Sequence, residues 1–252
     1  MGEAMNVLAV NSSPRAGGRS KTELMLEQLV AGMREAGASV ECVALREKTV
    51  RPCVACLTCW TRTPGVCAHK DDMAGELLGK WAAADLVVYA TPLYHYMMNG
   101  AMKTFIERTL PGVDPSWQVT DRGTTHPIRR PAPAGVVLSV AAFPEPAIFG
   151  ALSNYVRYLA SVGFMRRLVA EIYRPAAEAM VAPVFSDKCR DILAATKQAG
   201  REIVETGGVA EGTMGRIVQP IADPEVLAAG ANAMWKRAIA KGLRLGDPPE
   251  EK

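Results

Sequence analysis

Residues 6–33 read NVLAVNSSPRAGGRSKTELMLEQLVAGM and join an apolar run, a polar loop with two glycines and an amphipathic stretch. The apolar run at 6–11 predicts a short strand. From residue 21 onward, apolar side chains recur every three or four positions, which predicts a helix. Ser20 and Glu23 have the spacing of a capping box, and Gly37 follows the expected last turn. The segment therefore predicts strand, loop and helix, the first part of a βαβ unit.

The alternation of strand and helix continues along the chain. Further apolar runs predict strands at residues 39–45, 85–90, 135–141 and 168–173. Helical spacing predicts helices at residues 71–83, 100–109, 146–162, 186–206 and 224–241. We therefore expect an α/β fold in which a parallel doubly wound sheet carries helices on both faces.

Two irregular segments interrupt these elements. Residues 46–70 contain four of the six cysteines, and residues 110–133 are rich in proline and show no periodicity. A loop as long as 110–133 is more often functional than inert. No linker divides the chain, so we expect a single domain over residues 1–245, followed by a polar tail at 246–252.

The composition excludes several classes of protein. Of the 252 residues, 49% are hydrophobic and 22% are charged, as in a globular domain. The net charge is only +3 and the basic residues form no stripe, so we expect no nucleic-acid partner. The uncharged stretch at 131–144 contains three prolines and is too short to cross a bilayer, and Glu3 stands where a signal peptide needs basic residues. We therefore expect a cytoplasmic protein with no membrane partner.

The loop after the first strand has the features of a phosphate-binding loop. Its two glycines let backbone N–H groups turn toward a ligand, and the helix that follows points its positive end at the same place. The hydroxyl and cationic side chains available to a phosphate are Ser13, Arg15, Ser20, Lys21 and Thr22. The loop matches neither the Walker motif nor G-x-G-x-x-G. A polar connecting loop with a capping serine is the alternative interpretation.

Four cysteines have the spacing C-x2-C-x2-C-x7-C: they are Cys53, Cys56, Cys59 and Cys67. The first three match the C-x2-C-x2-C run of bacterial ferredoxins, which favours a [4Fe–4S] cluster. Structural zinc usually takes two C-x2-C pairs that are further apart. Zinc and free or redox-active thiols remain the alternatives. We expect Cys42 and Cys189 to be buried thiols in a strand and a helix.

Two more loops follow expected strands, and in open α/β sheets ligands bind outside the carboxyl ends of the strands. Residues 91–96, TPLYHY, offer an apolar wall suited to the edge of a planar ring, and aromatics packed into the core are the alternative. Residues 141–146, AAFPEP, are placed to line the same ring. The sequence has no nucleophile elbow, no His-Glu-x-x-His and no paired carboxylates, so we expect no catalytic acid or base.

Taken together, these segments resemble the flavodoxin-like NAD(P)H-dependent FMN reductases, and specifically their iron-sulfur flavoprotein branch. The matching stretches follow the order of the family over residues 5–175: SSPRAGGRS, RPCVACLTCW with Cys67 and KDDM, ATPLYHYMMNGAMKTFIER, SVAAFPEP and EIYRPAAE. The resemblance implies a flavodoxin-like, doubly wound five-stranded parallel sheet and a flavin-dependent oxidoreductase. Arg19 departs from the asparagine common in the family, and Ala141 and Ala142 replace a loop that often contains glycine or cysteine.

The resemblance also implies a set of cofactors and partners. It implies that FMN binds through its phosphate at Ser13, Arg15, Ser20, Lys21 and Thr22, and through its ring at Pro92, Leu93, Tyr94 and His95, with Ala142 and Phe143 nearby. It implies a [4Fe–4S] cluster on the four cysteines and a redox partner such as ferredoxin or NAD(P)H. It further implies a homodimer or homotetramer in which cluster and flavin approach across an interface. Two other functions remain open: a cluster-free NAD(P)H-dependent FMN or quinone reductase, and a non-catalytic zinc-binding or redox-sensing module.

Overall fold

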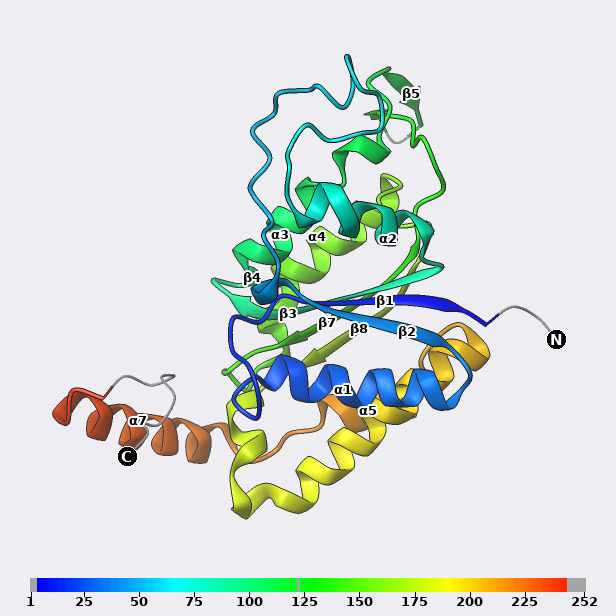
Figure 1. Cartoon of the computed structure of the whole chain (residues 1–252). Helices are drawn as coiled ribbons and strands as arrows, with labels where there is room; N and C mark the ends of the chain where they lie inside the picture. Colours follow the sequence, from blue (N-terminus) through cyan, green and yellow to red (C-terminus); the bar gives the residue numbers. More distant parts are fainter. Residues whose placement is uncertain (1–3, 122, 244–252) are drawn as a thin grey trace.

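A computed structural model describes residues 4–121 and 123–243, so the expected tail at 246–252 lies outside the described residues. Its centre is a sheet with strand order β2-β1-β3-β7-β8 (Figure 1). The five strands are β1 (Asn6–Asn11), β2 (Ser39–Ala44), β3 (Leu86–Tyr94), β7 (Ala134–Val140) and β8 (Leu168–Arg174). Every neighbouring pair along this order is parallel. The order is that of flavodoxin, which confirms the predicted five-stranded doubly wound sheet.

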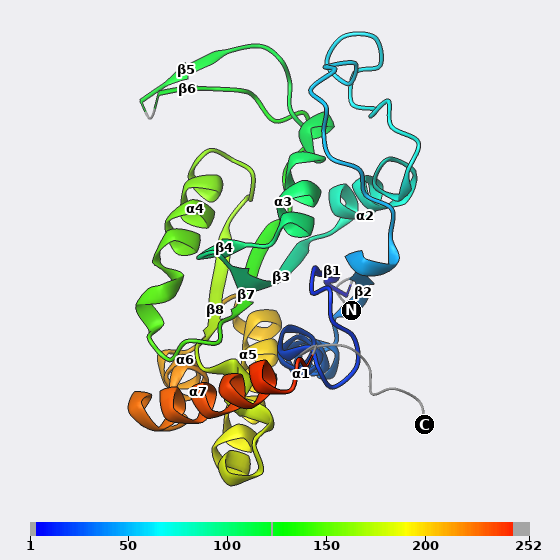
Figure 2. The ribbon, with the colours of Figure 1, turned by 90° about the vertical axis from the view of Figure 1, so that its left-hand side faces the viewer.

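Helices cover both faces of the sheet (Figures 1 and 2). One face carries α1 (Lys21–Glu35) and α5 (Ser186–Thr206). The other carries α2 (Leu78–Ala83), α3 (Gly100–Glu107) and α4 (Gly150–Ser161). Two helices follow α5, namely α6 (Glu211–Val218) and α7 (Pro224–Ala240), and α7 projects away from the sheet in Figure 1. The described residues contain no helix long and apolar enough to cross a membrane.

Single helical turns link or extend these elements. Five of them are 3-10 turns: η1 (Leu45–Glu47), η3 (Leu110–Gly112), η4 (Pro146–Phe149), η5 (Ala177–Val181) and η6 (Pro183–Phe185). The helix predicted at 71–83 begins instead as a π-helical turn, η2 (Met73–Leu77), and continues as α2. The helix predicted at 146–162 likewise begins as η4, because Pro146 supports a tight first turn.

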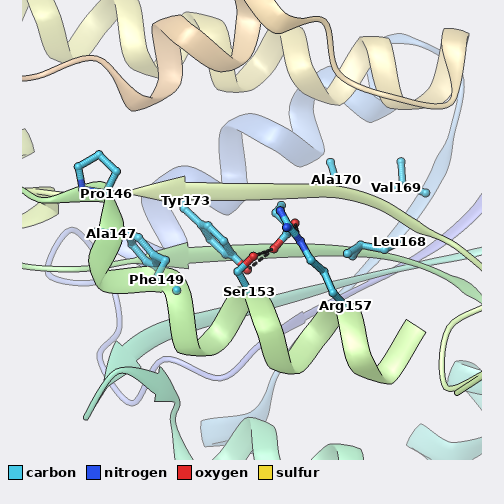
Figure 3. Close-up of a pocket in the computed structure, with 11 residues that line it drawn as sticks. Pro146, Ala147, Phe149, Ser153, Arg157, Leu168, Val169, Ala170 and Tyr173 are labelled. Carbon is cyan, nitrogen blue, oxygen red and sulfur yellow. Dashed lines mark hydrogen bonds and ion pairs between the residues drawn. The ribbon is translucent and has the colours of Figure 1, made fainter. Parts of the chain in front are cut away.

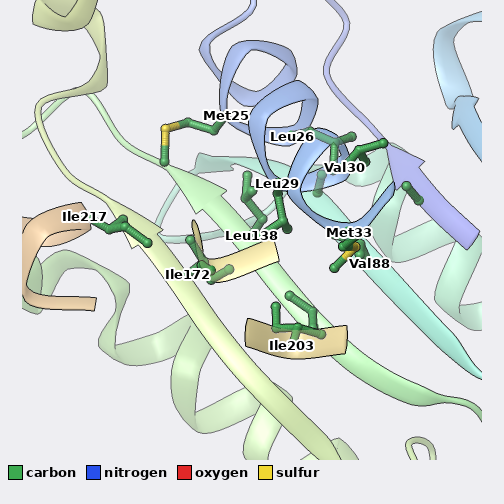
Figure 4. Close-up of a cluster of buried hydrophobic side chains, with 14 of the residues drawn as sticks. Met25, Leu26, Leu29, Val30, Met33, Val88, Leu138, Ile172, Ile203 and Ile217 are labelled. Carbon is green, nitrogen blue, oxygen red and sulfur yellow. The ribbon is translucent and has the colours of Figure 1, made fainter. Parts of the chain in front are cut away.

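The sheet separates two hydrophobic cores, since successive strand residues face opposite sides. Val7, Ala9 and Val88 face α1 and α5, whereas Leu8 and Val10 face α2 and α3. Figure 4 shows the first core, where Leu29 and Met33 of α1 meet strand residues of the sheet and Ile203 of α5. Both cores are fully buried, as expected for a parallel sheet covered on two sides.

The two helices of the first face cross at a pair of glycines. A Cβ atom on Gly32 would lie 1.8 Å from the carbonyl oxygen of Lys197, and one on Gly200 would lie 2.0 Å from that of Leu29. Each glycine therefore lets the backbone of the other helix approach to contact distance. This close crossing fixes α1, and with it the loop that precedes α1, against α5.

Three local predictions are corrected. The strand predicted at 85–90 runs on to Tyr94 and pairs with the short antiparallel strand β4 (Met97–Met98). The segment 110–133, predicted as a loop without structure, contains an antiparallel pair, β5 (Gln118–Thr120) and β6 (Gly123–Thr125). Three-residue strands are too short to give a periodic signal. Helix α6 was not predicted, because its glycines weaken the helical pattern.

Candidate functional site

The loop between β1 and α1 is built around two buried serines. The Ser20 hydroxyl donates to the Ser13 hydroxyl oxygen over 2.9 Å and accepts from the backbone N–H of Glu23 at 3.1 Å. The Ser20 half of the predicted capping box is therefore confirmed, whereas the Glu23 carboxylate bonds to the N–H of Gly17 and to Arg46. Gly17 and Gly18 have φ values of +47° and +33°, in the left-handed region that favours glycine. Five polar side chains expected at a phosphate belong to this loop or to the first turn of α1, and four of them are buried: Ser13, Ser20, Lys21 and Thr22.

The cations of this loop face carboxylates in the structure. Arg15 Nη1 donates to Glu178 Oε1 over 2.9 Å, and Lys21 Nζ lies 3.7 Å from Glu178 Oε2. Glu23 Oε2 accepts from the backbone N–H of Gly17 at 3.1 Å. Carboxylate oxygens thus contact the groups that a phosphate would use. Glu178 was not among the predicted site residues, because it lies 163 positions from Arg15 in the chain.

The second loop is the turn between β3 and β4. His95 and Tyr96 occupy the turn with φ values of +47° and +66°, which bulky residues rarely adopt. The Tyr94 and Tyr96 side chains are 45% and 57% exposed. Of the residues predicted to contact a ring, Tyr94 and His95 are exposed, Leu93 is half-buried, and Pro92 is buried within β3.

The third loop follows β7 at the same edge of the sheet. Ala142 and Phe143 are exposed there, Phe143 by 58%. The carboxyl ends of the adjacent strands β3 and β7 therefore both carry uncovered aromatic side chains. An uncovered aromatic face is a usual contact for a planar ring.

Asn99 links the first two loops and was not predicted as a site residue. It is the buried N-cap of α3, and its Oδ1 accepts from Met102 N at 3.1 Å. Its Nδ2 donates to the carbonyl oxygen of Ser12 over 2.6 Å, and its backbone N–H donates to Thr91 Oγ1 over 3.1 Å. An asparagine before a helix is a recognisable cap pattern, but its bond to Ser12 depends on the tertiary fold.

The four cysteines of the C-x2-C-x2-C-x7-C motif line one pocket at the far end of α3. All four thiols are free; Cys59 is buried, Cys53 and Cys67 are half-buried, and Cys56 is exposed. Burial raises the pKa of the Cys59 thiol, and the charges of the neighbouring cysteine thiols add to the rise. Between successive cysteines, Ala55 and Leu57 take left-handed φ values of +50° and +53°. This backbone conformation is uncommon for such residues and is often found at functional sites.

His69 and Arg108 also line the cysteine pocket. Arg108 Nη2 lies 3.4 Å from the Cys67 sulfur, and Nη1 donates to the carbonyl oxygen of Arg51 over 2.6 Å. Buried His69 Nε2 and Arg108 Nε have no hydrogen-bond partner among the described residues. Among the residues that the structure describes, no three His, Cys, Asp or Glu side chains lie close enough together to hold a single metal ion.

Two other cysteines lie away from this pocket. Cys189 is buried on α5, as predicted, but Cys42 is exposed. The prediction for Cys42 was wrong because β2 is an edge strand with little helix cover over its outer residues.

A separate hollow of about 520 Å³ lies between α4 and β8 (Figure 3). The Glu171 carboxylate there accepts hydrogen bonds from Ser153, from Arg157 Nε at 2.8 Å and from the Tyr173 hydroxyl at 3.1 Å. The Tyr173 ring stacks on Phe149 with centroids 4.7 Å apart. None of the predicted site residues lines this hollow, and its polar groups already satisfy one another.

Comparison with known proteins agrees with this geometry. Residues 5–119 match the family described as NADPH-dependent FMN reductase. This match covers slightly less than half of the chain. An iron-sulfur flavoprotein of Archaeoglobus fulgidus is 34% identical over 107 residues, 42% of this chain and 46% of the relative. An iron-sulfur flavoprotein of Methanocaldococcus jannaschii is 29% identical over 107 residues, 42% of this chain and 53% of the relative. The matched part thus spans about half the length of these relatives.

Solved structures are similar to this chain over most of its length. The NAD(P)H:quinone oxidoreductase from Methanothermobacter marburgensis has a TM-score of 0.57 and 19% identity, and covers 80% of this chain and 98% of its own. An FMN-dependent NADH-azoreductase from Bacillus anthracis in complex with FMN has a TM-score of 0.57 and 10% identity, with 80% and 100% covered. At these identities the likeness shows the fold alone, and it confirms the flavodoxin-like architecture.

Proposed function

We propose that this chain is an FMN-dependent electron-transfer oxidoreductase with a [4Fe–4S] cluster as its second redox centre. The observation that carries the proposal is the meeting of three loops at one edge of the sheet. The first offers buried hydroxyls and cations, and the other two offer exposed aromatic side chains. An anion site beside an aromatic surface suits a flavin mononucleotide, whose phosphate and planar ring need these two environments. The family match over residues 5–119 supports the same flavin.

The residues of the first loop would hold the FMN phosphate. Ser13, Ser20 and Thr22 supply hydroxyls from buried positions, and Arg15 and Lys21 supply charge. The ring would lie against the next two loops, at Tyr94, His95, Ala142 and Phe143, with Leu93 beneath them. Pro92 would act from within β3 by shaping the turn. Asn99 keeps the phosphate loop and the ring loop in a fixed relation through its bond to Ser12.

The residues of the cysteine pocket fit an iron-sulfur cluster. Four free thiols line one pocket, and four thiolate ligands are the set that holds such a cluster. Two nitrogen atoms near the cysteines, Arg108 Nε and His69 Nε2, are buried and have no hydrogen-bond partner among the described residues. Hydrogen bonds to cluster sulfur are a common way in which proteins adjust such a centre. The four cysteines would ligate the iron, and Arg108 would hold Cys67 in place.

When bound, FMN exchanges electrons in pairs with a hydride donor and singly with an iron-sulfur cluster. The chain contributes position and electrostatics. The left-handed turn at His95 and Tyr96 and the capped helix α3 shape the loop that would face the ring, and α3 runs from that loop to Arg108 beside the cysteines. NAD(P)H, or a protein such as ferredoxin, would be the redox partner.

A homodimer or homotetramer is part of the proposal. The cysteine loop, residues 46–70, and the segment 110–133 lie at one end of the molecule (Figure 1) and make contact where the Trp60 and His126 rings are 5.0 Å apart. This end exposes apolar side chains, including Trp117 by 80% and Val119 by 82%. Exposed apolar groups of this size are typical of surfaces that contact another protein.

The proposal is tested by purifying the full chain without oxygen and measuring flavin, iron, zinc and acid-labile sulfide per chain. About one FMN with about four iron atoms per chain is the expected result. Flavin without iron would favour the cluster-free reductase. A colourless protein that contains zinc would instead favour the non-catalytic module and overturn the proposal.

A further inference from the structure

Glu178 lies at the phosphate loop, although it is 163 positions from Arg15 in the sequence. It belongs to η5, directly after β8, and its two carboxylate oxygens reach the two cations of the loop. Arg15 donates to one oxygen over 2.9 Å, and the ammonium of Lys21 is 3.7 Å from the other. Lys21 is buried, so water screens its charge poorly. Glu178 lies within ion-pair distance of this charge.

The backbone holds Glu178 in this position. Ala176 takes a left-handed φ of +51° and donates its N–H to the carbonyl oxygen of Phe143 over 2.8 Å. Ala177 donates to the carbonyl oxygen of Ala141 over 2.8 Å. These bonds fix the start of η5 on the loop that follows β7. The backbone that carries Glu178 is therefore fixed beside the phosphate loop, and the side chain itself is 53% exposed.

A phosphate that enters the loop meets this carboxylate. The dianion and Glu178 would share Arg15 and Lys21, and two negative charges at short range repel each other. The bonds that the phosphate gains with the cations are offset by those that Glu178 loses. The charge available to the phosphate is thus smaller than the two cations alone would supply.

We propose that Glu178 competes with the flavin phosphate for Arg15 and Lys21 and lowers the affinity of the chain for FMN. This inference rests on the proposed FMN site. As a consequence, bound FMN exchanges with FMN in solution more readily than it would if Arg15 and Lys21 had no acidic partner. Glu178 then lowers the contribution of the phosphate to FMN binding and leaves the contacts of the ring unchanged.

The test compares FMN with riboflavin, which has the same ring and no phosphate. The flavin-depleted full chain and its Glu178→Gln variant are titrated with each flavin, and binding is followed by flavin fluorescence. We expect Glu178→Gln to lower the Kd for FMN about tenfold, or about 1.4 kcal/mol, and to leave the Kd for riboflavin unchanged. The matched control is Glu205→Gln, which alters an exposed carboxyl on α5 and should change neither value.

Three results would overturn the inference while leaving the FMN site intact. FMN binding by Glu178→Gln that is weaker than wild type would make Glu178 a support for Arg15. Unchanged FMN binding would mean that no competition occurs. Equal changes for FMN and riboflavin would place the effect on the ring. A wild-type chain that binds no FMN would overturn the proposed function itself, and the inference with it.

A double-mutant cycle sharpens the result. In an Arg15→Ala background the carboxylate has lost its closer partner, so Glu178→Gln should tighten FMN binding by less than in the wild type. Strict additivity of the two changes would contradict competition for a shared cation.

Discussion

The guanidinium of Arg108 and the carboxylate of Asp71 form a two-pronged ion pair, with N–O distances of 2.7 and 2.9 Å and side-chain exposures of 1% and 0%. Arg108 ends α3, which begins at the ring loop, and Asp71 lies four positions after Cys67. The pair therefore ties the cysteine segment at residues 46–70 to the helix that follows the turn between β3 and β4. The Asp71 carboxylate also accepts hydrogen bonds from the backbone N–H groups of Arg51 and Ala74.

Asp71→Asn should destabilise the fold strongly, because it leaves the buried Arg108 charge without its counter-charge. Breaking a buried ion pair on one side costs about 3–5 kcal/mol. Urea denaturation followed by circular dichroism measures the loss as a lower midpoint. The control is Asp187→Asn, which removes an exposed partner of Arg190 and should leave the midpoint unchanged. Equal midpoints for Asp71→Asn and wild type would show that the pair is not structural.

The same pair predicts how stability depends on pH. The Arg108 guanidinium holds the pKa of the Asp71 carboxyl far below its ordinary value, and the backbone bonds from Arg51 and Ala74 act in the same direction. A carboxyl with a lowered pKa in the folded state contributes its full stability above its unfolded pKa, about 3.9, and loses it as the pH falls further. The difference in unfolding free energy between wild type and Asp71→Asn should therefore be constant between pH 7 and 5 and shrink below about pH 4. A difference that grows on acidification would contradict this assignment.

Local patterns in the sequence predict the parallel sheet and the longest helices well. The helix at 186–206 has the predicted bounds, and Ser20 caps α1 as its spacing indicates. These features depend on hydrophobic period and on contacts within a few residues. The strand predicted at residues 85–90 continues through Pro92, because β3 pairs there with β7 and beyond it with β4. Tertiary pairing overrides a local break there.

Local sequence patterns do not predict contacts between segments that are distant in the sequence. The four cysteines and the loops at the sheet edge could be identified from spacing and from the position of each loop after a strand. Glu178, Asn99 and Arg108 could not, because each acts through a partner that only the fold brings near. The exposure of Cys42 was missed for a related reason, since a sequence does not say which strand forms the edge of the sheet.

The crossing of α1 and α5 predicts a second site of strong destabilisation. Gly200→Ala places a methyl group 2.0 Å from the carbonyl oxygen of Leu29, so the two helices must separate. Overpacking of this kind costs about 1–3 kcal/mol. The control is Gly212→Ala on α6, where an added Cβ meets no atom within 4 Å and favours the helix. Thermal unfolding should show a lower Tm for Gly200→Ala alone. Equal Tm values for the two variants would mean that the crossing tolerates an added methyl group.

Arg15→Ala should weaken FMN binding while the fold stays intact, because Arg15 is an exposed loop residue. A hydrogen bond between a charged group and phosphate contributes about 1.5–3 kcal/mol, so the Kd for FMN should rise roughly tenfold to somewhat over a hundredfold. Titration of the flavin-depleted chain measures the change, and Arg190→Ala on the surface of α5 is the control. An unchanged Kd would remove Arg15 from the phosphate site.

The last prediction separates the cysteines into two groups. The four that line one pocket should act as a unit, because a cluster that loses one of its thiolate ligands exposes an iron and becomes labile. Cys59→Ser, prepared without oxygen, should therefore lose most of its iron and its broad visible absorbance and still retain FMN. Cys42→Ser is the matched control: its exposed thiol lies on β2, outside the pocket, so iron and FMN should both remain. Iron retained in full by Cys59→Ser, or absent from wild type purified in the same way, would rule out the cluster and leave a flavin reductase without one.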